Sequence, residues 1–331
     1  MIAVVLAARD KNAAINNKRR VKERTLIIVS LLGGAAAMLF ALLVFRHKVR
    51  RLKFMVGIPF IILMQIGAIM FVFNSNLSVG YYEIKSEKIS GEIKLALIAD
   101  LHSCAYGDGQ NELVRVIEAE RPDAILFAGD IFDDDLPPGH AARFISEIAG
   151  KYPCFYVTGN HEFWSGSADE YKEILESHGV KVLEGTSEIL EVNGNKIRIS
   201  GIDDLETDKY QSRSISYASQ LNLLSDTPNY DGLFNILLSH RPERIHEYLP
   251  FAYDLVLSGH AHGGQWRIPY ILNNGLLSPN QGLFPKYTNG KHLFGDTVLI
   301  VSRGLAREST PFIPRIFNRP EIVVVVLKEM D

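Results

Sequence analysis

Five short stretches of sequence decide the fold of this chain: Asp100-Leu101-His102, Gly129-Asp130-Ile131-Phe132-Asp133, Gly159-Asn160-His161-Glu162, Ser239-His240 and Gly259-His260-Ala261-His262. Each of them follows a short apolar run that is typical of a buried strand. Functional side chains of open α/β sheets gather at the carboxyl ends of the strands. We therefore expect the five stretches to bring carboxylate, imidazole and amide groups to one edge of a sheet.

The residue types in these stretches predict a metal centre. Asp100 and His102 are two residues apart, as are His260 and His262, and in an extended segment such pairs point the same way. Carboxylates combined with imidazoles suit Mn²⁺, Fe or Zn²⁺, and Mn²⁺ is the favoured choice. The number of ligands suits two cations, and open coordination positions would remain for water and substrate. Such a pair of cations indicates a metal-dependent hydrolase.

Taken singly, each stretch is weak evidence, because a lone buried histidine is more often a core residue than a ligand. Gly129, Gly159 and Gly259 precede the clusters, where a sharp turn or a close backbone approach requires glycine. Ordinary loop glycines remain the alternative. The other five histidines show no pattern and are expected at the surface: His47, His140, His178, His246 and His292.

From about Glu83 onward, strand-like runs alternate with helical patterns, which indicates an α/β domain. Helical spacing appears in residues 111–121 and 168–178. The polar stretch 203–231 is weakly patterned and is read as a cap or a surface excursion. Strands are expected at residues 93–99, 124–128, 155–158, 180–183, 189–192, 196–202, 234–239, 255–258, 298–302 and 322–327.

Two apolar runs lie near the N-terminus, at residues 25–45 and 54–73. Each is long enough to cross a hydrocarbon core of about 30 Å at 1.5 Å per residue. The loop between them, 46–53, carries five Lys/Arg. We expect a basic tail over residues 1–24, a retained transmembrane hairpin over 25–73, and a linker with a first strand region over 74–92. Two buried core helices are the alternative.

The charge is distributed unevenly along the chain. Residues 1–53 carry 12 Lys/Arg and two Asp/Glu, a net charge of +10, whereas the remainder has a net charge of −13. A basic end on an acidic body indicates a segment close to a membrane, and no nucleic-acid partner is expected. The positive-inside rule leaves the side of the acidic body open, because seven Lys/Arg precede residue 25 and five lie in the loop.

The order of the motifs, D-x-H, G-D-x-x-D, G-N-H-E, H and G-H-x-H, resembles the calcineurin-like metallophosphoesterase superfamily over residues 93–327. Three further stretches are similar to its membrane-anchored bacterial phosphodiesterase branch, which is related to UDP-2,3-diacylglucosamine pyrophosphatase-type enzymes: Gly263-Gly264-Gln265, Pro279-Asn280-Gln281-Gly282 and Phe317-Asn318-Arg319-Pro320-Glu321. The resemblance implies a four-layer α/β/β/α sandwich over 93–331, and it favours an extracytoplasmic catalytic domain.

The resemblance also implies roles for individual residues. One metal would be bound by Asp100, His102 and His262, the other by Asn160, His240 and His260, and Asp130 would bridge them. A hydroxide bridging the metals would attack phosphorus in line. His161 would protonate the leaving oxygen, and Asp133 would orient its ring.

One departure from the family pattern bears on the substrate. Protein Ser/Thr phosphatases have an arginine at the positions of Asp134 and Thr158, so phosphoproteins are disfavoured. Phosphodiesters, nucleotides or lipid-linked pyrophosphates such as UDP-2,3-diacylglucosamine remain. A non-catalytic metal-binding membrane module and a nuclease are the alternative functions. Candidate groups for holding substrate phosphates are Arg303 and Arg319, together with Arg307 and Arg315, and structural ion pairs are the alternative role for all four.

Overall fold

The protein is described by a computed structural model that covers residues 1–210, 213–225, 232–307 and 314–330. The chain forms two compact units, Met1–Phe73 (unit 1) and Asn74–Asp331 (unit 2). The boundary between them lies at the start of the stretch that the sequence predicts as a linker. Each unit has its own hydrophobic core.

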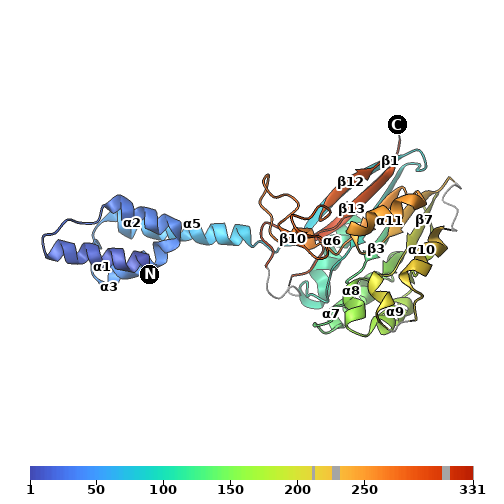
Figure 1. The fold of residues 1–331 in the computed structure, drawn as a ribbon, viewed down its shortest axis with the longest axis horizontal. Helices are drawn as coiled ribbons and strands as arrows, with labels where there is room; N and C mark the ends of the chain where they lie inside the picture. Colours follow the sequence, from blue (N-terminus) through green and yellow to red (C-terminus); the bar gives the residue numbers. More distant parts are fainter. Residues whose placement is uncertain (211–212, 226–231, 308–313, 331) are drawn as a thin grey trace. The chain divides into compact units, whose positions relative to one another are not determined.

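Unit 2 is built around two six-stranded sheets (Figure 1). The first has the order β1 (Ser78–Ser86), β14 (Glu321–Glu329), β2 (Glu92–Ile98), β3 (Ala124–Ala128), β4 (Cys154–Val157) and β5 (Lys181–Val182). The second has the order β12 (Gly290–Phe294), β13 (Thr297–Val301), β9 (Leu255–Ser258), β8 (Phe234–Leu238), β7 (Asn195–Gly201) and β6 (Thr186–Val192). A small hairpin joins β10 (Leu277–Ser278) to β11 (Gly282–Leu283).

The strands that lead to the five motifs are parallel within each sheet. In the first sheet β2, β3, β4 and β5 are parallel, and in the second β13, β9, β8 and β7 are parallel. β3, β4, β8 and β9 consist entirely of buried residues, which explains their unbroken apolar sequences. Because these strands are parallel, their carboxyl ends meet at one edge of each sheet.

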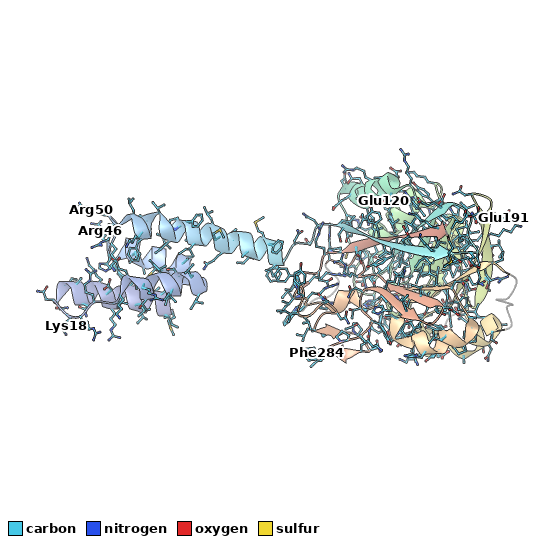
Figure 2. All side chains as sticks on the ribbon, turned by 90° about the horizontal axis from the view of Figure 1, so that it is seen from above. Lys18, Arg46, Arg50, Glu120, Glu191 and Phe284 are labelled. Carbon is cyan, nitrogen blue, oxygen red and sulfur yellow. The ribbon has the colours of Figure 1, made fainter. Side chains whose placement is uncertain are left out.

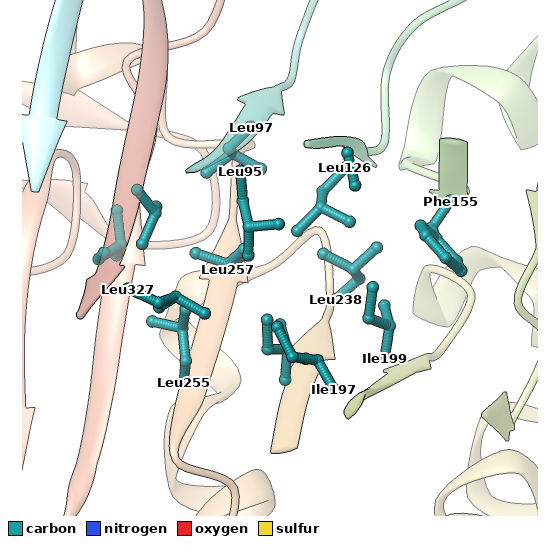
Figure 3. Packing of buried hydrophobic residues seen from close by; sticks show 14 of the residues in the cluster. Leu95, Leu97, Leu126, Phe155, Ile197, Ile199, Leu238, Leu255, Leu257 and Leu327 are labelled. Atoms are coloured by element: carbon teal, nitrogen blue, oxygen red, sulfur yellow. The ribbon is translucent and has the colours of Figure 1, made fainter. Parts of the chain in front are cut away.

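The main core lies between the two sheets. Leu95, Leu97 and Leu126 from the first sheet meet Leu238 and Leu257 from the second (Figure 3). The outer face of the first sheet packs against α6 (Asn111–Glu120), α7 (Gly139–Ile148) and α9 (Ala168–Ser177). The outer face of the second packs against α10 (Tyr217–Ser225) and α11 (Ile245–Tyr248). The four-layer α/β/β/α sandwich is thereby confirmed.

The weakly patterned stretch 203–231 contributes to this last layer. It contains the short helix η3 (Leu205–Asp208) and α10, whose Leu224 is buried against the second sheet. Residues 211–212 and 226–231 lie outside the described residues.

Unit 1 is helical throughout. It comprises α1 (Ile2–Ile15), α2 (Glu23–Val29), the kinked turn η1 (Ser30–Gly34), α3 (Ala35–Val44), α4 (Leu52–Met55) and α5 (Gly57–Val72). Two stretches are long and apolar enough to cross a membrane, Glu23–Val44 and Leu52–Val72. The segment predicted as a basic tail contains α1, an alanine-rich helix whose Ala3 and Ala7 are buried in the core of this unit.

The first apolar stretch folds back on itself. Gly33 has a φ of 100°, which interrupts the helix, and Gln65 of α5 donates to the carbonyls of Ser30 and Leu31 at the interruption. Glu23 at the start of α2 lies 3.5 Å from Lys48 Nζ, a residue that follows α3. A straight helix of this length would separate its ends by ~33 Å. The structure therefore differs from the single straight crossing that the sequence predicts for residues 25–45.

As a result, the two basic segments of unit 1 lie at the same end. Buried Asp10 Oδ2 lies 3.3 Å from Arg20 Nη2, 2.7 Å from His47 Nε2 and 3.0 Å from Lys48 Nζ. Figure 2 shows Lys18, Arg46 and Arg50 gathered at one end of this unit. His47 is thus buried in an ion-pair network, so the prediction that it lies at the surface is wrong.

Candidate metal centre

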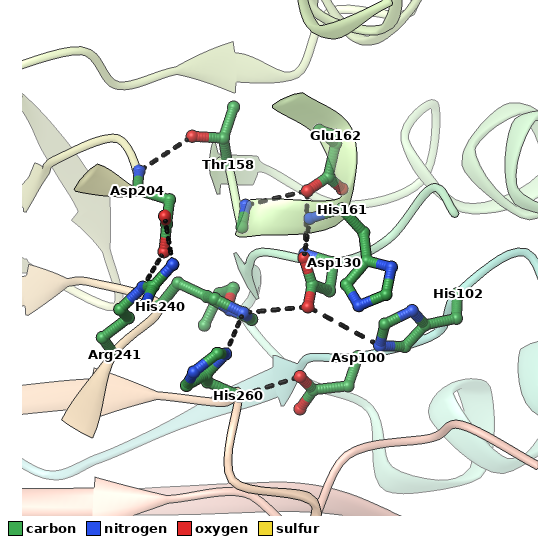
Figure 4. Close-up of polar contacts among 12 residues, drawn as sticks. Asp100, His102, Asp130, Thr158, His161, Glu162, Asp204, His240, Arg241 and His260 are labelled. Carbon is green, nitrogen blue, oxygen red and sulfur yellow. Dashed lines mark hydrogen bonds and ion pairs between the residues drawn. The ribbon is translucent and has the colours of Figure 1, made fainter. Parts of the chain in front are cut away.

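The predicted ligands gather just beyond the carboxyl ends of the parallel strands (Figure 4). Asp100 follows β2, Asp130 follows β3, and Asn160 begins the short helix α8 (Asn160–Trp164) after β4. His240 follows β8, and His260 follows β9 in the opposing sheet. Residues separated by up to 160 positions in the sequence therefore meet at one place, as the backbone amide of His260 donating to Asp100 Oδ1 at 2.8 Å illustrates.

The ligand atoms form two adjoining groups. In one, atoms of Asp100, His102 and His262 lie within 4.8 Å of one another. In the other, atoms of Asp130, His240 and His260 do so. Asp130 Oδ2 is 3.0 Å from His240 Nε2 and 3.6 Å from His102 Nε2, so it lies between the two groups. All six of these residues are buried.

Several ligand atoms are buried without a hydrogen-bond partner among the described residues. Three of these atoms are Asp100 Oδ2, His102 Nε2 and Asn160 Oδ1. A buried polar atom without a partner costs roughly 1–3 kcal/mol, so three of them at one place need an explanation. Divalent cations would satisfy them, and carboxylate, imidazole and amide donors fit such ions. The residues present therefore fit a pair of divalent metals.

The backbone at the ligands is not extended. The φ angles of Asp100, His102 and Asp130 are 51°, 48° and 52°, and those of His260 and His262 are 65° and 46°. These values lie in the left-handed region, which costs free energy for residues other than glycine and clusters at functional sites. The inference that paired ligands converge because the segment is extended is therefore wrong. They converge because the chain turns tightly at each ligand.

Glu162 holds these turns in place, and no role was predicted for it. Its buried carboxylate accepts hydrogen bonds from the amides of Gly159, Asp130, Ile131 and Phe132 at 2.7 to 3.1 Å. Burial, and next the charge of Asp130, raise the pKa of Glu162 to about 7. The signal in the sequence was its place at the end of the Gly159-Asn160-His161-Glu162 motif. Its function is to tie the loop after β3 to the start of α8.

Further groups orient the imidazoles, as outer partners commonly do in metal sites. The Nδ1 atom of His102 is 2.8 Å from Asp133 Oδ1, and that of His240 is 2.7 Å from the Ala128 carbonyl. His260 Nε2 is 2.8 Å from Asn280 Oδ1, in the loop that carries the β10–β11 hairpin. The contact to Asn280 was not predicted from the sequence, although the stretch containing it was recognised.

His161 lies beside the two groups with its ring held by carboxylates. Its Nδ1 is 2.5 Å from Asp134 Oδ1 and 3.3 Å from Asp133 Oδ1. The nearer partner is therefore Asp134, whereas Asp133 makes its shorter contact with His102. Burial alone would lower the pKa of His161, but neighbouring carboxylates, with Asp130 the largest contributor, raise it to about 10.

The arginines considered for phosphate binding are engaged in structural contacts. Arg303 Nη2 binds Glu321 Oε1 at 2.9 Å, and Arg319 donates to the carbonyls of Asn76 and Leu77. Arg307 pairs with Glu112. Arg315 reaches a predicted ligand, because its Nη2 lies 3.4 Å from His262 Nδ1.

The four-layer fold and a buried cluster of carboxylates and imidazoles at the strand ends together define a metal-dependent phosphoester hydrolase. The family model for calcineurin-like phosphoesterases matches residues 93–264, and the chain belongs to that family. Residues 1–54 match a second family model, a protein family of unknown function called DUF1294. The catalytic chemistry is therefore assigned to unit 2.

Similar proteins support the assignment. The chain is 32% identical to the uncharacterized metallophosphoesterase YkuE of Bacillus subtilis, over 72% of this chain and 80% of YkuE. It is 28% identical to a zebrafish (Danio rerio) transmembrane protein with a metallophosphoesterase domain, over 73% of this chain and 54% of that protein. It is 24% identical to the phosphodiesterase YaeI of Escherichia coli, over 75% of this chain and 89% of YaeI.

Proposed function

We propose that this chain is a membrane-anchored phosphohydrolase that cleaves a phosphodiester or pyrophosphate bond with the help of two divalent cations, best supplied as Mn²⁺. The observation that carries the proposal is the set of buried, unpartnered ligand atoms, Asp100 Oδ2, His102 Nε2 and Asn160 Oδ1. Asp100 and His102 belong to one group of close ligand atoms and Asp130 to the adjoining one, in a chain whose family hydrolyses phosphoesters.

In this proposal one cation is held by Asp100, His102 and His262, and the other by Asn160, His240 and His260, with Asp130 between them. Cations bound there would activate water and neutralise the charge on the phosphoryl oxygens. The protein contributes the rigid frame: Glu162 fixes the loop, and the imidazoles are held by Asp133, Asn280 and backbone carbonyls.

His161 is the proposed proton donor to the leaving oxygen. Asp134 and Asp133 contact Nδ1, which leaves Nε2 as the atom that donates. The raised pKa of His161 keeps the ring protonated at neutral pH. An imidazolium placed in this way contributes typically 10²–10⁴-fold to the rate.

The proposed substrate is a phosphodiester or a lipid-linked pyrophosphate. Asp134 occupies a position where phosphoprotein phosphatases have an arginine, and it binds His161 instead of a phosphate. A phosphodiesterase and a transmembrane protein are among the relatives. The apolar helix α5, whose only buried residue is Ile58, ends at Val72, and only Phe73 lies between it and unit 2, so a substrate at a membrane surface is within reach.

The arrangement of charge in unit 1 supports a particular orientation. Basic residues of the two N-terminal segments come together in unit 1, because Arg20 and Lys48 share Asp10, and Lys18, Arg46 and Arg50 lie at one end of the unit (Figure 2). If α5 is the single crossing, the positive-inside rule keeps these cations in the cytoplasm. Unit 2 then lies on the extracytoplasmic side.

The test uses the full chain, reconstituted in lipid nanodiscs and stripped of metal. Adding Mn²⁺ should restore close to two ions per chain and hydrolysis of bis(p-nitrophenyl) phosphate, with weaker hydrolysis of the monoester. Asp130→Asn should lose both, while the matched control Asp135→Asn, an exposed neighbour, should keep both. UDP-2,3-diacylglucosamine and phosphatidylglycerol complete the substrate panel. Metal binding without hydrolysis of any compound would instead indicate a non-catalytic module.

A further inference from the structure

One loop of unit 2 displays apolar side chains to solvent. Between β9 and β12, six large apolar residues are exposed: Trp266, Ile268, Tyr270, Ile271, Leu283 and Phe284 (the apolar rim). The exposed fractions of Tyr270, Ile271 and Phe284 are 96%, 81% and 70%. Monomeric soluble proteins rarely present such a cluster, and its presence usually marks a binding surface.

The apolar rim lies on a loop with its own backbone hydrogen bonds, so the fold itself holds these side chains at the surface. Ile268 and Leu272 exchange backbone hydrogen bonds, and Leu277 pairs with Leu283 in the β10–β11 hairpin. Gly264 and Gly275 pack so closely that a Cβ on Gly264 would lie 2.0 Å from the Asn274 carbonyl oxygen. The backbone is thus satisfied internally while the apolar side chains point outward.

The charge of this loop is the opposite of that of the body around it. Residues 265–291 contain three Lys/Arg and no Asp or Glu, although the chain after residue 53 has a net charge of −13. Basic residues beside exposed tryptophan, tyrosine and aliphatic side chains are typical of surfaces that enter the headgroup layer of a bilayer.

The same loop is connected to the point where the chain enters unit 2. The amide of Arg267 donates to the carbonyl of Ile316, and Arg319, three residues later, binds the carbonyls of Asn76 and Leu77. Only residues 73–77 separate α5 from β1, a tether of at most ~18 Å. If α5 is the anchor, the start of β1 is therefore held close to the membrane.

We infer that the apolar rim is a bilayer-docking surface that seats the metal centre against the lipid headgroups. The inference rests on the proposed function only in taking α5 as the anchor. The loop also contains Asn280, whose side chain contacts His260, so a docked rim would place the centre beside phosphates in the headgroup layer. The ligand is thus a lipid surface, and the substrate class that it favours is a lipid-borne phosphodiester or pyrophosphate.

The test measures contact with lipid through quenching of tryptophan fluorescence by brominated acyl chains. The full chain, with Trp164→Phe and Trp266→Phe, receives one new tryptophan by Ile271→Trp in the rim or by Ile189→Trp in β6. Figure 2 shows Phe284 of the rim and Glu191 of β6 at opposite sides of unit 2. Both substituted side chains are already exposed, so neither change disturbs the core.

In nanodiscs made with brominated lipid, we expect at least two-fold quenching for Ile271→Trp and little change for Ile189→Trp. Equal quenching at both positions, or none at the rim, would overturn the inference, and a rim covered by a second copy of the chain would give that second result. Since quenching needs no turnover, quenching at the rim together with inactivity of the unsubstituted chain would count against the proposed function alone.

Discussion

Asp134 Oδ1 lies 2.5 Å from His161 Nδ1, closer than Asp133, whose Oδ1 is 3.3 Å away. Asp133 instead makes its short contact, 2.8 Å, with His102. The two adjacent carboxylates are therefore divided between two tasks. One orients a proposed metal ligand, and the other holds the proposed proton donor.

This division predicts a pH effect of Asp134→Asn. Neighbouring carboxylates raise the pKa of His161 to about 10, so the ring is protonated, and able to donate, at neutral pH. Removing one of the carboxylates that raise this pKa should lower it by roughly 1 to 2 units. The alkaline limb of the pH profile of kcat/KM, measured with a poor leaving group, should move to lower pH by the same amount.

The matched control is Asp135→Asn, which removes a neighbouring exposed carboxylate, whereas the carboxylates that contact His161 are those of Asp133 and Asp134. Its alkaline limb should stay where it is in the unaltered chain. If Asp134→Asn lowers the rate equally at every pH, the carboxylate has only a structural role and the assignment to His161 is incorrect.

The sequence predicts which residues form the site better than it predicts the backbone conformation that brings them together. All five motifs follow largely buried parallel strands, and that pattern was enough to place Asp100, Asp130 and His260 together. The left-handed backbone at these residues was not predictable, because it depends on contacts such as Glu162 with distant amides. The intrinsic backbone preferences of Asp and His favour negative φ angles at these positions, and hydrogen bonds to distant residues override those preferences.

In unit 1, the composition predicts how long the apolar segments are but not how the chain folds within them. The stretch 25–45 is apolar enough to cross a bilayer, and only Gly33-Gly34 indicated that it could turn. What decides the outcome is non-local: Gln65 binds the carbonyls freed at the turn, and buried Asp10 draws His47 inward. Neither pairing leaves a periodic signal in the sequence.

Glu162→Ala should destabilise the chain strongly. The substitution leaves four buried backbone amides without their acceptor, each worth ~1–3 kcal/mol when unsatisfied. A total loss of at least ~3 kcal/mol would lower Tm by roughly 6–12 °C for a unit of this size. Thermal unfolding in detergent checks the value. Glu170→Ala, an exposed change on α9, should shift Tm very little, and an equal shift in both variants would contradict the role of Glu162.

The fold-back of residues 23–44 predicts where each unit lies. With Cys104→Ala and Cys154→Ala as background, a single cysteine is introduced by Lys18→Cys in unit 1 or by Glu191→Cys in unit 2. Because the cations gather where α5 begins, we expect a membrane-impermeant maleimide to label Glu191→Cys in intact spheroplasts. Lys18→Cys should be labelled only after permeabilisation. The reverse pattern would place the catalytic unit in the cytoplasm.

Gly159→Ala should disable the metal centre for a purely steric reason. The backbone of Gly159 has a φ of −108°, which alanine adopts readily, so no conformational strain enters. A Cβ at this position, however, would lie 2.1 Å from Asp130 Oδ1 and 2.6 Å from the Asp130 amide nitrogen. The carboxylate between the two ligand groups would have to move, and the loop that Glu162 holds would move with it. We expect Mn²⁺ content to fall well below two ions per chain, with hydrolysis lost in proportion.

Gly139→Ala provides the control, because a Cβ there meets nothing within 4 Å and alanine favours the helix α7 that begins at this residue. Full metal loading in Gly159→Ala would show that the loop can yield, and that Asp130 is not held as tightly as its contacts indicate.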